Sequence, residues 1–189
     1  MDYENILDCK SRKEFYEWLK DNHEREEECW VACKRGKIQD DDIFYYIDAV
    51  YVALCFGWID SIHKNINGKR MQKFTPRKNN SPWGELNKQR CRYLINHDLM
   101  SKADDVLPDL DEEFDIKEDI LNKLKIDEEI WENFSNFPEP YQKIRIGNIE
   151  RERKKKDVFE RMLNNFIEKT KENKMYGNWD DYGRLNSIK

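Results

Sequence analysis

The dipeptide Asn67-Gly68 constrains the fold of this chain more than any other feature. Asparagine and glycine both tolerate the positive φ that the two central positions of a type I′ turn require. The β-prone stretches on either side, residues 58–66 and 69–75, are therefore predicted to fold back on each other as a hairpin. Gly57 interrupts the helical pattern before the first strand. Pro76 ends the second strand because proline has no amide hydrogen to donate.

The residues before the hairpin predict a helix, a strand and a second helix. Ser11 and Glu14 form a capping box in front of a helix over residues 12–22. Residues 29–33 are short and β-prone, and residues 43–54 carry an apolar stripe with helical spacing. We therefore predict an α+β fold, in which a small twisted antiparallel sheet, built from the N-terminal strand and the hairpin, packs with helices and is followed by a C-terminal helical region.

The residues after the hairpin predict helices only. Ser81-Pro82 has the form of a helix start, with serine as N-cap and proline in the first turn. Two short helices are expected near residues 116–124 and 130–134, and one long helix over residues 141–173. The tail is expected to be either docked or disordered. The predicted divisions are an α+β core over residues 1–103, a helical extension over residues 104–174 and the tail over residues 175–189.

Composition sets limits on the class of protein. Charged residues make up 39% of the chain, and the aromatic residues, 13%, supply the area for a buried core. No apolar run is long enough to span a membrane, and the N-terminus lacks the pattern of a signal peptide, so a cytoplasmic protein is expected. The odd number of cysteines, five, and their irregular spacing predict buried thiols and no metal site.

Charge is segregated along the chain. Residues 63–92 hold nine basic residues and one acid, for a net charge of +8, whereas residues 103–140 hold fourteen acids and three lysines, for a net charge of -11. Two interpretations follow. The acidic segment could lie near the basic one and shorten the range of its field, or the basic segment could form an anion-binding face.

Two motifs around the hairpin resemble those of a known family. Residues 49–60 read AVYVALCFGWID, and residues 74–78 read FTPRK, followed by Ser81, Trp83 and Asn87. In this order they resemble the bacteriocin-protection family, also called YdeI or OmpD-associated proteins, over about residues 10–100. The resemblance implies a small α+β unit with a twisted antiparallel sheet. It also implies a role in protection against antimicrobial peptides or stress.

The hairpin register suggests a pair of charged residues. If the turn is Asn67-Gly68, Ile66 faces Lys69, Asp60 faces Thr75 and Trp58 faces Arg77, which places Asp60 diagonal to Arg77. The pair could simply fix the end of the strand. Alternatively, Arg77, Lys78 and Trp83 could form an anion pocket with the helix N-terminus at Ser81.

Three functions remain open at this point. The first is a non-enzymatic binding protein whose basic hairpin recognises an anionic small molecule or an acidic protein surface. The second is a small enzyme with a cleft around Asp60, His63 and Arg77, and the third is a single-stranded nucleic-acid-binding protein in which aromatic side chains stack on bases. No catalytic residue, metal ligand or cofactor is assigned. The ligand-binding candidates are Trp58, Asp60, Phe74, Arg77, Lys78, Ser81, Trp83 and Asn87.

Overall fold

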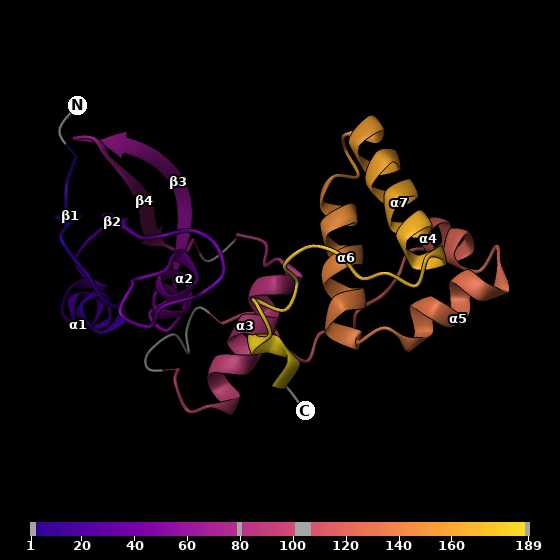
Figure 1. The fold of residues 1–189 in the computed structure, drawn as a ribbon, viewed down its shortest axis with the longest axis horizontal. Coiled ribbons are helices and arrows are strands. Elements are labelled where there is room, and N and C mark those ends of the chain that lie inside the picture. Colours follow the sequence, from indigo (N-terminus) through magenta and orange to yellow (C-terminus); the bar gives the residue numbers. More distant parts are fainter. Residues whose placement is uncertain (1–2, 79–80, 101–106, 188–189) are drawn as a thin grey trace. The chain divides into compact units, whose positions relative to one another are not determined.

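The computed structural model describes residues 3–78, 81–100 and 107–187, and these form two compact units (Figure 1). The first unit comprises Met1–Pro82 and Arg90–Pro108 and holds the sheet; the second comprises Trp83–Gln89 and Asp109–Ser187 and holds the C-terminal helices. The division passes through helix α3, Glu85–Asn96. It differs from the division expected at residue 103, because residues 83–89 group with the second unit. The fold class is α+β, as predicted.

The sheet of the first unit has four strands in the order β1-β2-β4-β3. They are β1, Ile6–Leu7; β2, Cys29–Ala32; β3, Trp58–Ile66; and β4, Lys69–Pro76. The antiparallel pairs β2–β4 and β3–β4 confirm the predicted strand and hairpin, and Asn67 and Gly68 have φ of 51° and 77° at the turn. Strand β1, which pairs parallel to β2, was not predicted because two residues are too few to show a pattern.

Two helices lie wholly within the first unit. Helix α1, Arg12–Asn22, begins as predicted, with the Ser11 hydroxyl accepting a hydrogen bond from the Glu14 amide at 3.2 Å. Helix α2, Tyr46–Leu54, packs against α1 and β3. It begins three residues later than predicted because the preceding backbone bonds to Lys34, whose amide donates to Phe44 O at 3.0 Å and whose carbonyl accepts from the Tyr46 amide at 2.8 Å.

The core of the first unit is aromatic. Phe15 of α1 is fully buried, and its ring centroid lies 5.3 Å from that of Phe74 on β4 and 5.9 Å from that of Phe44. Trp58, also buried, meets Trp18 edge to face at 6.1 Å. Large rings joining α1 to the sheet bury much apolar area per residue, and this lets a chain so rich in charge keep a core.

The second unit is helical. It contains α4, Glu118–Leu124; α5, Glu128–Asn136; α6, Glu139–Arg151; α7, Lys156–Lys171; and a 3-10 helix, Arg184–Ser187. The two short helices occur where they were predicted, and Asp127 caps α5 by accepting from the Glu129 amide at 2.9 Å. The centre of the core is formed by fully buried side chains from α4, α6 and α7, namely Ile120, Leu124, Tyr141, Ile146 and Phe166.

The single long helix predicted over residues 141–173 is wrong. The chain turns between α6 and α7, where the Glu152 amide bonds to Ile149 O, the Arg153 amide to Glu150 O and the Lys155 amide to Glu152 O. If α6 and α7 formed one straight helix, the apolar side chains of the first could not pack against those of the second. Folding back lets α6 pack against α7 and bury both, while the charged residues between them stay at the turn.

The tail is docked on the second unit over the described residues 175–187. Trp179 is 7% exposed and meets Tyr141 edge to face at 5.4 Å, and Leu185 is 1% exposed. Gly177 has a φ of +73°, and a Cβ built there would come within 2.3 Å of Arg145 Nη2. The positive φ therefore favours glycine at this position, whereas the close contact is with the end of a flexible side chain that can move.

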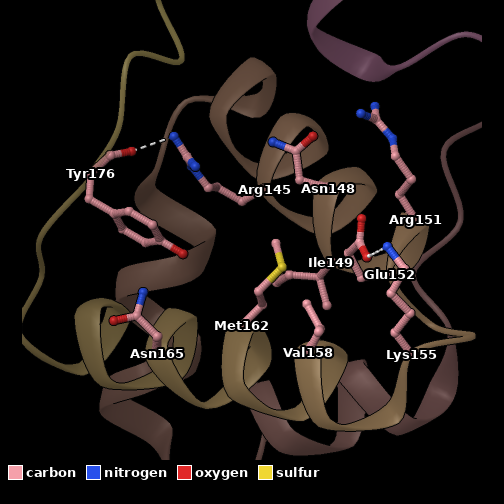
Figure 2. A pocket seen from close by; sticks show the side chains of 10 residues that line it. All are labelled: Arg145, Asn148, Ile149, Arg151, Glu152, Lys155, Val158, Met162, Asn165 and Tyr176. Atoms are coloured by element: carbon pink, nitrogen blue, oxygen red, sulfur yellow. Dashed lines mark hydrogen bonds and ion pairs between the residues drawn. The ribbon is translucent and has the colours of Figure 1, made fainter.

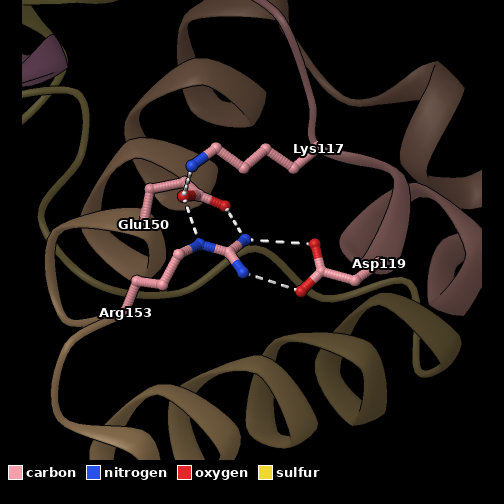
Figure 3. Close-up of polar contacts among 4 residues, drawn as sticks. All are labelled: Lys117, Asp119, Glu150 and Arg153. Carbon is pink, nitrogen blue, oxygen red and sulfur yellow. Dashed lines mark hydrogen bonds and ion pairs between the residues drawn. The ribbon is translucent and has the colours of Figure 1, made fainter.

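A charged network joins the start of α4 to the turn between α6 and α7 (Figure 3). The Arg153 guanidinium donates to both carboxylate oxygens of Asp119, at 2.8 and 3.1 Å, and to Glu150 through Nε at 2.7 Å and also through Nη2. Lys117 Nζ lies 3.4 Å from the Glu150 carboxylate. The hydrogen bonds from Arg153 hold the pKa of Asp119 and of Glu150 below their usual range, and the two carboxylates raise the pKa of Arg153.

Replacing Arg153 by glutamine (R153Q) is expected to destabilise the protein by roughly 1–2 kcal/mol near neutral pH, because several charged hydrogen bonds are lost at a partly exposed site. Carboxylates with lowered pKa contribute stability that is fully present above their ordinary pKa, about 4, and lost as the pH falls through the lowered values. The difference between wild type and R153Q should therefore shrink on acidification. Denaturant unfolding at about pH 7 and about pH 3 measures it.

The matched control is Lys154→Gln, which removes the same charge from an exposed side chain in the same turn. It should leave the unfolding curve nearly unchanged. An equal loss of stability in both variants would show that net charge, rather than the network, is responsible.

None of the helices in the described part of the chain combines the length and the apolar character that crossing a membrane requires.

Candidate functional site

A β-bulge resets the register of the hairpin. Ile66 faces Lys69 as predicted, but one extra residue lies on β3 between Asp60 and His63. As a result Asp60 faces Phe74 instead of Thr75, and Trp58 faces Pro76 instead of Arg77, so this part of the predicted register is wrong. The bulge has no signal in the residue pattern that would distinguish it from a regular strand.

Arg77 lies just beyond the end of β4 and is 6% exposed. Its Nη2 donates to the carbonyl of Ser81 at 3.1 Å and to that of Pro82 at 2.7 Å, while its amide donates to Gly57 O at 2.8 Å. Burial lowers the pKa of its guanidinium. The predicted contact with Asp60 is wrong: the hydrogen bonds of Arg77 hold the chain that follows the hairpin.

Helix α3 does not begin at Ser81-Pro82, and this prediction is also wrong. The first helical amides, those of Asn87 and Lys88, donate to Gly84 O at 2.9 and 3.1 Å. The carbonyls of Ser81 and Pro82 accept from Arg77 in place of helical amides. No helix N-terminus is therefore present at Ser81 to attract an anion.

Asp60 belongs to a polar cluster that the sequence did not indicate. Its carboxylate accepts a hydrogen bond from the Tyr46 hydroxyl at 2.7 Å. Arg35 lies over the Tyr46 ring, 4.2 Å from its centroid, and donates to the Gln72 side chain at 2.6 Å. Burial, with the nearby Asp60 charge, raises the pKa of Tyr46, so its hydroxyl stays protonated and donates. These contacts tie α2 to the sheet, and only the tertiary structure brings them together.

The three side chains of the enzyme hypothesis occupy separate environments. Asp60 bonds to Tyr46, Arg77 bonds to backbone carbonyls, and His63 is exposed on β3, where its Nε2 accepts from Arg70 at 2.8 Å. A general base must lie within hydrogen-bond reach of its partner in the reaction. The structure does not bring these three groups together in that way.

The other candidates divide between the core and the surface. Trp58 and Phe74 are 1% and 0% exposed, and Trp58 Nε1 donates to His23 O at 3.2 Å, so neither ring presents a face to a base. Lys78 is exposed and Ser81 is half-buried in the first unit. Trp83 and Asn87 are half-buried in the second unit.

The cysteines are all free thiols, and the structure buries Cys29, Cys55 and Cys91. Burial raises the pKa of Cys9 to about 11, and that of Cys33 and Cys55 to about 12. The thiolate is the nucleophilic form, so thiols with such pKa values are poor nucleophiles near neutral pH. Among the described residues no three His, Cys, Asp or Glu side chains are grouped to hold a metal ion.

The hairpin's free end carries the accessible charge of the sheet. Strand β2 pairs with β4 only over Met71 to Phe74, so the hairpin extends beyond β2 at its turn. Lys69 and Arg70 are exposed there, and Lys64 is exposed on β3 opposite Met71, where the pairing with β2 ends. Lys69 Nζ is 3.8 Å from the Asp8 carboxylate, but both side chains are more than two-thirds exposed, so this ion pair is weak. We call these three cations, Lys64, Lys69 and Arg70, the hairpin cations.

Nearer β2 the charge is neutralised. Lys73 forms an ion pair with Glu28 and lies 5.6 Å from the centroid of the Trp30 ring. Its hydrogen bond lowers the pKa of Glu28. Lys64, in contrast, lies over an aromatic ring, with its Nζ 5.7 Å from the centroid of the Tyr3 ring. In the described part of the chain, no carboxylate forms a direct ion pair with Lys64.

Comparison with curated proteins gave no match, and neither did comparison with solved structures. Comparison with protein families matches residues 7–105, the stretch that contains strands β2, β3 and β4 and the Asp60 cluster. The chain belongs to the family described as Domain of unknown function (DUF8412).

Proposed function

We propose that this is a non-enzymatic, cytoplasmic binding protein whose hairpin cations recognise an acidic protein surface. The observation that carries the proposal is the exposure of Lys64, Lys69 and Arg70 at the end of a hairpin that extends past its neighbouring strand. Opposite charges on two surfaces accelerate association and select the partner. The resemblance to bacteriocin-protection proteins supports a role in tolerance to antimicrobial peptides or stress.

The shape of the hairpin end favours a macromolecular partner over a small anion. A two-stranded end directs its side chains outward on both faces, so cations there meet an extended surface. Ile62, on the same strand as Lys64, is 49% exposed and adds apolar area. Aromatic stacking, which single-stranded nucleic acid uses, is not offered by the buried rings of Trp58 and Phe74. An acidic polypeptide is therefore the partner that the residues favour.

The test uses poly-L-glutamate as the acidic probe and oligo-dT as the nucleic-acid probe. Reversing the hairpin cations (K64E/K69E/R70E) is expected to weaken poly-L-glutamate binding at low salt about tenfold or more, because three surface attractions become repulsions. Wild-type affinity should also fall as salt is added, since exposed charges are screened. Fluorescence anisotropy of labelled probe measures both effects.

The matched control has the same net charge. Lys13, Lys20 and Lys37 are exposed in the same unit but lie outside the hairpin. K13E/K20E/K37E should retain most of the affinity. An equal loss in both triple variants would contradict the proposal, and tighter binding of oligo-dT than of poly-L-glutamate would favour the nucleic-acid hypothesis instead.

A further inference from the structure

A second candidate site lies in the helical unit, away from everything the sequence singled out. It is a pocket of about 520 Å³ lined by α6, the turn that follows it, α7 and the docked tail (Figure 2). Pockets of roughly 300–1,000 Å³ are typical of small-molecule sites. Every residue that lines it belongs to the second unit.

One part of the pocket is apolar. Ile149 of α6 and Val158 and Met162 of α7 point toward one another in the middle of the pocket (Figure 2). The side chain of Tyr176, from the tail, borders the same space. A ligand with a hydrocarbon or aromatic body would remove this apolar surface from water, at about 25 cal/mol per Å².

The polar part of the pocket is built around Arg145. Its guanidinium carbon lies 4.5 Å from the centroid of the Tyr176 ring and 5.4 Å from that of the Tyr141 ring, and its Nη2 donates to Tyr176 O. Its Nε is buried and has no hydrogen-bond acceptor among the described residues. Because Nε is shielded from solvent, the hydrogen bonds that the Arg145 side chain can offer to a ligand in the pocket come from its terminal guanidinium nitrogens.

The charges around the pocket favour an anion. Arg145, Arg151 and Lys155 line it, against one carboxylate, Glu152, which pairs with Lys155 at 2.8 Å. The side-chain amide of Asn148, one turn from Arg145 on α6, lies on the same side of the pocket as the guanidinium (Figure 2). An amide and a guanidinium together present several N–H donors, which a carboxylate or phosphate accepts.

We propose that this pocket binds a small organic anion with an apolar body. The acid group, a carboxylate or a phosphate monoester, accepts hydrogen bonds from Arg145 and Asn148, and the body covers Ile149, Val158 and Met162. The site is independent of the hairpin cations, because it contains residues of the second unit only.

The experiment titrates the full chain with naphthalene-2-carboxylate, 1-naphthyl phosphate and the neutral alcohol 2-naphthalenemethanol, using calorimetry. Both acids share the anionic chemistry, and the tighter of the two identifies the preferred acid group. At least one acid is expected to bind about tenfold or more tightly than the alcohol. Equal binding of the alcohol, or no binding by either acid, would overturn the proposal.

A nearly isosteric variant tests the polar part. Asn148→Asp places a negative charge one turn from Arg145 and is expected to weaken acid binding about tenfold or more. Asn164→Asp, on an exposed part of α7, is the matched control and should keep wild-type affinity. A similar loss in both variants would contradict the assignment, once unfolding curves show that both are folded.

A direct readout follows the Arg145 side chain itself. In a spectrum of arginine Nε–Hε groups, the Arg145 signal should move when the acid binds, whereas the signal of Arg161, exposed on α7, should not. The K64E/K69E/R70E variant should bind the acid as wild type does, which separates failure of this site from failure of the hairpin. Acid binding without movement of the Arg145 signal would overturn the site.

Discussion

Replacing Phe15 by alanine (F15A) is expected to lower the free energy of unfolding by about 3–5 kcal/mol, which is a large share of the stability of a typical domain. Phe15 is fully buried, and it is the side chain of α1 whose ring meets both Phe44 and Phe74. Removing the ring loses its own burial and leaves a cavity that rigid aromatic neighbours cannot fill. Denaturant unfolding followed by circular dichroism measures the loss.

Phe15→Leu is the matched control, because it keeps most of the apolar volume and removes the ring. It should cost less than half as much as alanine, in line with the smaller cavity. If F15A unfolded at the same denaturant concentration as wild type, Phe15 would not be the link between α1 and the sheet.

Truncating Trp179 (W179A) is expected to release the tail from the helical unit. Replacing a large buried aromatic residue by alanine costs about 3–5 kcal/mol, and a terminal segment is poorly ordered unless such contacts tie it down. Further ties of the tail include the buried side chain of Leu185 and the hydrogen bonds of Tyr176, whose amide donates to the Tyr141 hydroxyl at 3.3 Å and whose carbonyl accepts from Arg145. Limited proteolysis should therefore cut W179A between residues 175 and 187 much faster than wild type.

Tyr182 supplies the control for the tail. It is 40% exposed, so Tyr182→Ala should leave the cleavage rate close to that of wild type. Because Tyr176 also borders the pocket, W179A should weaken binding of the organic acid as well. If W179A were cleaved no faster than wild type, Trp179 would not be the residue that holds the tail.

Local sequence signals predicted most elements of the fold correctly. Asn67-Gly68 requires positive φ, Ser11 caps α1, and the spacing of Ile47, Val50 and Leu54 fits one face of a helix. Each of these signals depends only on residues that are close together in the chain, so it can be recognised from the sequence alone. The α+β class followed from adding them along the chain.

The errors arose where side-chain hydrogen bonds, helix packing or a bulge decide the local structure, because the residue pattern does not express these contacts. The carbonyls of Ser81 and Pro82 bond to Arg77, so a strong helix-start signal is not used. The turn between α6 and α7 exists because two apolar stripes cover each other. The extra residue between Asp60 and His63 has no local signature, and it alone removed the predicted pair of Asp60 with Arg77.

The candidate sites were predicted only in part. The positive charge of the hairpin could be read from Lys64, Lys69 and Arg70, but which cations stay exposed depends on the neighbouring strand and on Glu28. The helical pocket could not be foreseen, because Arg145 and Tyr176 are separated by a complete helix and meet only when the tail docks.

The most direct test of the account maps poly-L-glutamate binding onto the isotope-labelled chain by NMR. The account predicts that the amide signals of Lys64, Lys69 and Arg70 move first, that they move together with increasing probe, and that added salt reverses the change. Movement confined to the second unit, with the hairpin signals unchanged, would contradict the claim that the hairpin cations form the recognition surface.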